Sequence, residues 1–187
     1  MRKLLFMLAC IVSFLGHAEA SSAPAETVIS ELLSFLVSER FDSRLGTQQA
    51  LMDKWLNSEL LTYSNVIECD AARALKEENR PLSYVDAEMF FDRWDTPMQC
   101  EISGLKADGS KYVADVECRW GKGQDHSEGE TIQLFVYLVS EGGKWKVANI
   151  KHGRQEEAGN TKTDLVTRMR DARRQSSHPE YCENKFR

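Results

Sequence analysis

The hydrophobic pattern of this chain changes from helical to strand-like spacing close to Pro97. Before that point, apolar side chains recur every three or four positions, which is the spacing of one face of an amphipathic helix. Beyond it, apolar and polar side chains alternate, which is typical of strands covered on one side. Helices followed by a run of strands predict an α+β fold, with the helices packed on an antiparallel sheet.

Three helices are predicted in the first half of the chain. Pro81 ends the helical run because proline has no backbone N–H to donate. The following residues, 82–97, are then expected to form a connection rich in acidic and aromatic side chains. The first and third segments with helical spacing are residues 26–40 and residues 63–76. The second segment lies between them: Thr47 is placed to cap its start, and it runs towards Leu61.

Four strands and one more helix are predicted in the second half. Asp108-Gly109 and Gly142-Gly143 are hairpin-turn signals, because glycine adopts the backbone conformations that tight turns require. These turns predict a curved antiparallel meander on which the N-terminal helices pack, with a C-terminal helix over residues 161–175. The predicted strands are residues 98–105, 111–120, 130–140 and 144–152.

The first twenty residues have the plan of a secretory signal peptide. Two basic residues precede an almost continuous apolar run over residues 4–15, and Ala18-Glu19-Ala20 is a small-residue cleavage site. The apolar run is shorter than the ~20 residues that a membrane-spanning helix needs. Cleavage ahead of Ser21 and export to the periplasm are therefore predicted, and secretion remains the open alternative.

Cys10 lies inside this apolar run, and a lipoprotein acylated at Cys10 is a competing interpretation. It leaves only residues 4–9 as the apolar core, which is short for the apolar region of an export signal, and the apolar run continues past the cysteine. The sequence therefore favours a cleaved leader, whose removal also takes Cys10 away.

Charge and length limit what the mature chain can do. The whole chain has a formal net charge of −5, and loss of a leader with two cations and one anion changes it to −6. An acidic protein without a basic stripe is not expected to bind nucleic acid. No second apolar run is long enough to span a membrane. Residues 21–160 are expected to form one domain, on which a C-terminal helix and tail, residues 161–187, pack.

Four cysteines remain in the mature chain, and an even count in an oxidising compartment predicts disulfides. Cys100 and Cys118 flank the hairpin at Asp108-Gly109, and with the glycine at its centre they lie opposite each other at bridging distance. That leaves Cys69 to pair with Cys182, which would tie the tail to a helix. Free thiols or a zinc site are the alternatives, and the lack of C-x-x-C spacing argues against zinc.

Two segments of the chain resemble a known family. Residues 81–86 (PLSYVD), with Phe90 and Asp92, follow the helices, and residues 138–150 (LVSEGGKWKVANI) close the meander. In this order they resemble a bacterial family of exported domains of unknown function, whose fold is similar to that of nuclear transport factor 2. The resemblance covers residues 26–152 and implies a cone-shaped α+β fold with a mouth for a ligand or partner. It implies no catalytic residues, because fold alone does not specify function.

The sharpest polar cluster is Asp92-Arg93-Trp94-Asp95. In a binding site, Asp92 and Asp95 form an acid pair at a pocket rim, suited to general-base chemistry or to a hard cation. The simpler interpretation is local, because carboxylates at this spacing commonly cap turns. The candidate ligand-binding residues are Asp92, Trp94 and Asp95, with the aromatic residues Trp120 and Tyr137.

Other polar motifs predict no chemistry. His126, His152 and His178 lack the spacing of metal ligands, and no glycine-rich loop precedes a helix. No metal, cofactor or catalytic residue is therefore predicted. The arginines of residues 168–174 give the last helix a basic flank, which either contacts an anionic partner or complements the helix C-terminus.

Three functions from different classes fit these features. The leading hypothesis is a periplasmic, non-enzymatic binding or interaction module for an envelope protein, a peptide or a small ligand. The second is an immunity-type inhibitor of a periplasm-acting toxin, because an acidic surface attracts a basic enzyme. The third is a cone-fold enzyme such as an isomerase or dehydratase, which needs a pocket acid or base, and only Asp92 and Asp95 are candidates.

Overall fold

The computed structural model describes residues 22–37, 49–78, 87–91, 97–121, 129–153 and 164–176, together with Cys182. These residues form several helices, then a sheet and a last helix. The helices are α1 (Ser22–Val37), α2 (Gln49–Trp55), α3 (Ser58–Glu78), α4 (Ala87–Phe91) and α6 (Leu165–Gln175). The strands are β1 (Gln99–Asp108), β2 (Lys111–Arg119), β3 (Thr131–Glu141) and β4 (Lys144–His152).

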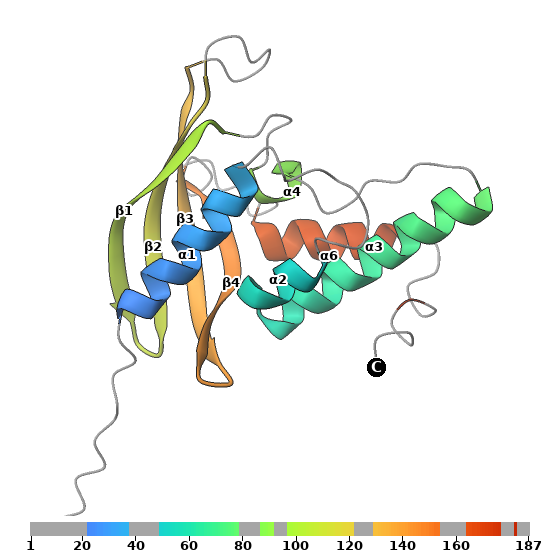
Figure 1. The fold of residues 1–187 in the computed structure, drawn as a ribbon, viewed down its shortest axis with the longest axis horizontal. Helices are drawn as coiled ribbons and strands as arrows, with labels where there is room; N and C mark the ends of the chain where they lie inside the picture. Colours follow the sequence, from blue (N-terminus) through green and yellow to red (C-terminus); the bar gives the residue numbers. More distant parts are fainter. Residues whose placement is uncertain are drawn as a thin grey trace, which may run out of the picture.

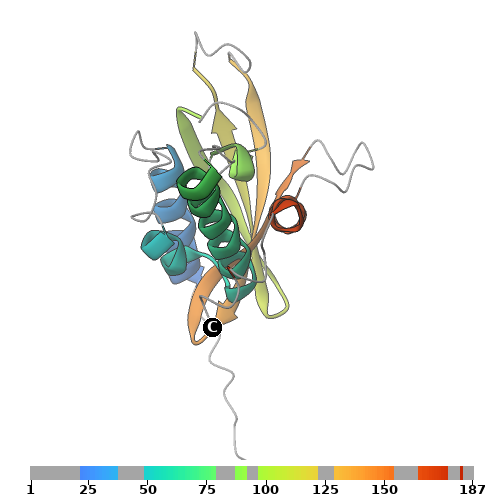
Figure 2. The same cartoon turned by 90° about the vertical axis from the view of Figure 1, so that its right-hand side faces the viewer.

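The four strands form one antiparallel sheet in the order β1-β2-β3-β4, which confirms the predicted meander. The labelled helices all lie to one side of this sheet (Figure 1). Turned by 90°, α1 lies beside β1, and α6 is seen end-on beside β4 (Figure 2). The chain is thus an α+β fold with one helix-covered sheet face.

The core lies between the helices and the inner face of the sheet. Strand β3 shows how it is built, because its fully buried residues alternate with half-buried or exposed ones. α1 contributes one buried stripe and contacts both edge strands, β1 and β4. α6 contributes Leu165 and Met169 to the same core.

The predicted boundary between the second and third helices was wrong. The helices separate at Leu56 and Asn57, several residues earlier than the apolar spacing suggested. Here the chain pairs with strand β4: Leu56 forms a bridge with Val147, and the backbone N–H of Asn57 donates to the Val147 carbonyl at 2.9 Å. The side chain of Asn57 then accepts from the N–H of Leu60 and caps α3.

The expected connection between helices and sheet contains one short helix, α4. Phe90 and Phe91 in α4 are fully buried, and the Phe91 ring packs edge-on against Trp120 at 6.2 Å. Arg168 of α6 donates to the carbonyls of Met89 and Phe90, which lie at the last turn of α4. A tertiary contact therefore completes a helix too short to be stable alone.

Both predicted disulfides are present. Cys69 of α3 pairs with Cys182 over a sequence separation of 113 residues, and Cys100 pairs with Cys118 across β1 and β2. The described parts of the chain contain no helix long and apolar enough to cross a membrane.

The Cys100–Cys118 pairing depends on an irregularity that the sequence analysis missed. The hairpin loop is Gly109-Ser110, since Asp108 pairs with Lys111, and this register alone would place Cys100 opposite Arg119. A bulge between Ile102 and Gly104 shifts the register by one residue and brings the two cysteines opposite each other.

Candidate functional site

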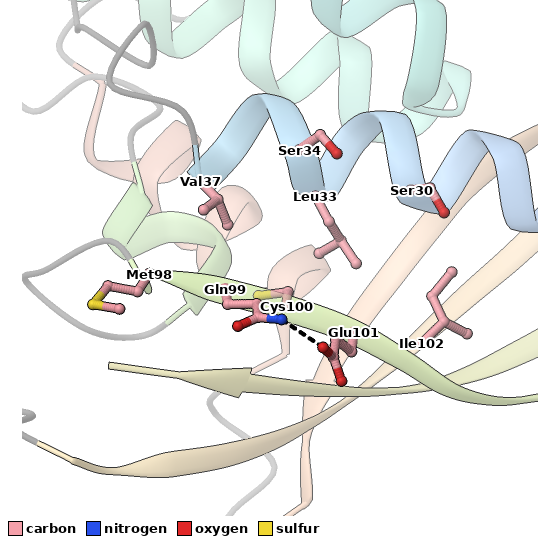
Figure 3. Close-up of a pocket in the computed structure, with 9 residues that line it drawn as sticks. All are labelled: Ser30, Leu33, Ser34, Val37, Met98, Gln99, Cys100, Glu101 and Ile102. Carbon is pink, nitrogen blue, oxygen red and sulfur yellow. Dashed lines mark hydrogen bonds between the residues drawn. The ribbon is translucent and has the colours of Figure 1, made fainter. Parts of the chain in front are cut away.

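The structure describes a groove of about 520 Å³ between α1 and the edge strand β1 (Figure 3). One wall is the last two turns of the helix, and the other is the start of the strand. Nine residues line it: Ser30, Leu33, Ser34, Val37, Met98, Gln99, Cys100, Glu101 and Ile102.

The helical wall is a single stripe of α1. Ser30, Leu33, Ser34 and Val37 stand at positions i, i+3, i+4 and i+7, so they share one face of the helix. Leu33 is buried, Val37 is half-buried and both serines are exposed. In Figure 3, Leu33 and Val37 project from the helix towards β1. The groove therefore has an apolar interior next to α1 and hydroxyl groups within reach of solvent.

The strand wall combines apolar, sulfur and polar groups. Met98 is 68% exposed, although large apolar side chains are usually buried. Gly121 makes this position possible, because a Cβ there would collide with the Met98 sulfur. Cys100 and Ile102 are half-buried, and the bridge to β2 holds Cys100 in place.

The outer side of the strand wall carries acidic side chains. Gln99 donates its side-chain amide to Glu101, as Figure 3 shows. Glu101 pairs in the sheet with Glu117, whose carboxylate accepts from Arg119 at 2.6 Å. This hydrogen bond to Glu117, together with the charge of Glu117, raises the pKa of Arg119 above its ordinary value. Arg119 bonds to Glu117 and also interacts electrostatically with Glu101, but within the described residues no cation forms a salt bridge with Glu101.

The structure separates the two predicted site residues that it describes. Trp120 is 3% exposed and belongs to the core, next to Phe91. Tyr137 is half-buried on β3 between the buried residues Val136 and Leu138, so its side chain is on the opposite, outer face of the sheet. There Lys151 lies over its ring at 5.1 Å. Neither residue lines the groove.

The remaining predicted site residues, Asp92, Trp94 and Asp95, lie outside the described residues, as do His126 and His178. His152 is buried at the end of β4 and is not part of the groove. In the described part of the chain, no three His, Cys, Asp or Glu side chains are grouped so that they could hold a metal ion.

Several arginines of α6 have partners within the protein. Arg168 binds the last turn of α4, as described above. Arg170 contacts Tyr63 and Glu59 of α3, and these hydrogen bonds raise its pKa. Arg173 lies over the Tyr63 ring at 5.7 Å. These contacts explain the basic flank as a helix–helix contact.

Sequence reasoning missed the groove, although part of its signal was present. Leu33 and Val37 fit the apolar stripe of α1, but the pattern does not show that they face the start of a strand some sixty residues later. Ser30 and Ser34 are small polar residues beside that stripe, which is a signal that a helix face is incompletely covered. Which strand they face is decided by tertiary packing.

The opposite edge of the sheet, β4, is covered by other elements. The backbone of Asn57 donates to Val147, and Asn149 of β4 accepts from the N–H of Val166 at 3.2 Å. Lys146 donates to the carbonyls of Asp53 and Lys54 at the end of α2. The groove therefore lies at the less protected of the two sheet edges.

No protein-family model matches this chain and no curated protein is significantly similar to it, so its site is defined by this geometry alone.

Proposed function

We propose that this protein is an exported, non-enzymatic binding module whose ligand occupies the groove between α1 and β1. The observation that carries the proposal is the groove itself. Its volume of about 520 Å³ falls within the range of ligand sites, and its lining offers apolar and polar surface in similar amounts. Leu33, Val37 and Ile102 supply the apolar surface, and the two serines with Gln99 and Glu101 supply the polar groups.

The composition of the groove favours binding over catalysis. Among the nine lining residues, Glu101 is the one with an ionisable side chain, since Cys100 is held in a disulfide. General acid–base catalysis usually needs a positioned group with a pKa tuned to its task. Glu101 is exposed and bonded to Gln99, an arrangement suited to ligand orientation.

The compartment is proposed from two independent features. The first twenty residues have the plan of a cleavable signal peptide, and periplasmic export follows from it. Two disulfides support an oxidising compartment, because such bonds persist mainly outside the cytosol.

The proposed fold is the cone-shaped one of the nuclear transport factor 2 type. It is supported by the helices that precede the meander and by the contacts of α1 with both edge strands.

A fragment screen by nuclear magnetic resonance tests the binding function. The oxidised protein beginning at Ser21 is screened with a mixture of small amphipathic compounds and short peptides. We expect the amide shifts of the hits to cluster at Leu33, Val37 and Ile102. Val37→Asp is expected to remove them, whereas Leu75→Asp, at an exposed position on α3, leaves them unchanged. Hits that cluster elsewhere, or none at all, contradict the proposal.

A further inference from the structure

The open edge of β1 offers hydrogen bonds as well as a groove. Cys100 and Cys118 face each other at a Cα separation of 4.1 Å, which is the short spacing of a non-hydrogen-bonded antiparallel pair. In such a pair, the backbone N–H and C=O of each residue point away from the opposite strand. Those of Cys100 therefore point out of the sheet, and the two-residue period gives Ile102 the same orientation.

Among the described residues, this edge has no neighbouring strand. β1 is the end strand of the sheet, and no backbone hydrogen bond outside the β1–β2 ladder involves Cys100 or Ile102 within the described residues. Proteins normally cover or blunt such an edge, because it is a template for another strand. The β4 edge is covered in this way, whereas β1 leaves its polar groups beside a groove.

The groove matches the dimensions of a short added strand. From Met98 to Ile102 the strand advances four residues, which is about 14 Å at ~3.4 Å per residue. A strand added along this stretch turns every second side chain towards α1, where Leu33 and Val37 lie. The side chains in between turn to the other face, next to Gln99 and Glu101.

Charge selects among extended segments. Glu101 and Glu117 are paired neighbours in the sheet, and Arg119 bonds to Glu117. Glu101 therefore leaves an acidic position at the edge, which favours a cation on the added strand at the alternate positions. Apolar residues at the other positions fit the groove between α1 and β1.

We propose that the ligand of the groove is an extended peptide segment with alternating apolar and basic residues, which binds by adding a strand to the free edge of β1. This inference rests on the proposed function and specifies its ligand class. Main-chain hydrogen bonds to Cys100 and Ile102 supply sequence-independent affinity, and the apolar groove with Glu101 supplies selectivity.

The experiment uses capped heptapeptides in which valine and lysine alternate, and the oxidised protein from Ser21 onwards. Binding is measured by fluorescence anisotropy. We compare the parent peptide with one N-methylated at alternate amides, which removes the donors, and with one in which glutamate replaces lysine. N-methylation is expected to weaken binding about tenfold, because two main-chain hydrogen bonds are lost. Glutamate is expected to weaken binding about fivefold, and Glu101→Gln to reduce that difference.

Two variants test the backbone of the protein itself. Ile102→Pro removes the outward N–H without removing a ladder donor, and Ile102→Ala is the matched control that retains it. We expect proline to abolish peptide binding and alanine to weaken it only a few-fold. If Ile102→Pro does not fold, as judged by circular dichroism, the N-methylated peptide on the unchanged protein decides the question.

The possible outcomes separate this inference from the proposed function. Equal binding of the parent and N-methylated peptides overturns strand addition. If small fragments still shift Leu33 and Val37 in that case, the groove remains a binding site for another class of ligand. If neither the peptides nor the small fragments bind, both proposals are overturned. Self-association of the protein through β1, seen as a peptide-insensitive dimer in sedimentation, also overturns the peptide assignment.

Discussion

The two edges of the sheet are stabilised in different ways. β4 buries Trp145, Val147, Ile150 and His152, and its backbone and side chains are bonded to the α2–α3 junction and to α6. β1 has no fully buried residue, and a covalent bridge to β2 supplements its ladder. A strand can therefore be held in a sheet without its outer edge being covered. A disulfide fixes β1 from one side and leaves the other side available.

Shortening a buried side chain at the covered β4 edge is expected to have the largest effect on the free energy of unfolding. Leu56 is 1% exposed and lies where the α2–α3 junction meets β4. Leu56→Ala creates a cavity and is expected to lower the free energy of unfolding by about 3 kcal/mol. The matched change at the open edge is Val37→Ala, for which we expect a loss below about 1 kcal/mol. Urea denaturation measures both, and equal losses would show that the edges do not differ.

Removal of the β1 bridge is the next largest change. Cys100→Ser combined with Cys118→Ser opens a loop with a sequence separation of 18 residues. The entropy of this loop corresponds to about 3 kcal/mol in the unfolding free energy. Because β1 buries so little, we expect hydrogen exchange to accelerate mainly in β1. Uniform acceleration through β3 and β4 would contradict the assignment of the bridge to this edge.

A smaller, pH-dependent effect is expected at the β3–β4 turn. Glu141 accepts from the hydroxyl and the N–H of Ser58 at the start of α3, and these bonds lower its pKa below the ordinary 4.5. The contribution of Glu141 to the free energy of unfolding is therefore complete above the pKa of this carboxyl in the unfolded chain. It is lost as the pH falls through the lower pKa of the folded protein. Glu141→Gln is expected to cost about 1 kcal/mol at most at pH 7, since the pair is near solvent.

Chemical denaturation from pH 7 to the acid side of 4.5 checks this sign. The difference between Glu141→Gln and the parent protein should shrink as the pH falls. A difference that grows towards acid pH would mean that Glu141 is not held as a carboxylate by Ser58.

The least perturbing comparison requires no substitution. The N–H groups of Cys100 and Ile102 point away from β2, whereas that of Glu101 lies in the ladder. We expect amide exchange of the first two to approach the rate of exposed peptides and that of Glu101 to be slower. Similar protection of all three would show that another element of the protein occupies the edge.

The cysteine pairing shows how far alternation in the sequence reaches. The hairpin signal placed Cys100 opposite Cys118, and the bridge is there. The turn, however, is centred between Gly109 and Ser110, which shifts the register by one residue, and the bulge after Ile102 shifts it back. A bulge depends on how the strand must bend over its neighbours, and the cysteine pattern contains no such information.

The groove was not predictable for a similar reason. The apolar stripe of α1 was visible, as was the strand that begins near Met98. Their contact spans about sixty residues, and no local pattern specifies which strand a helix faces. The predicted aromatic site residues, Trp120 and Tyr137, were selected by residue type, and the sheet places them on opposite faces.

From the sequence one could derive an α+β fold, its antiparallel meander and the expectation of two cysteine pairs. These follow from periodicity, turn residues and cysteine number, which act over short distances along the chain or through simple pairing. The tertiary structure alone decided the break at Asn57, the bulge in β1 and the difference between the two sheet edges. The physical reason is that each depends on backbone groups whose partners come from distant segments, and those partners exist only once the helices have packed on the sheet.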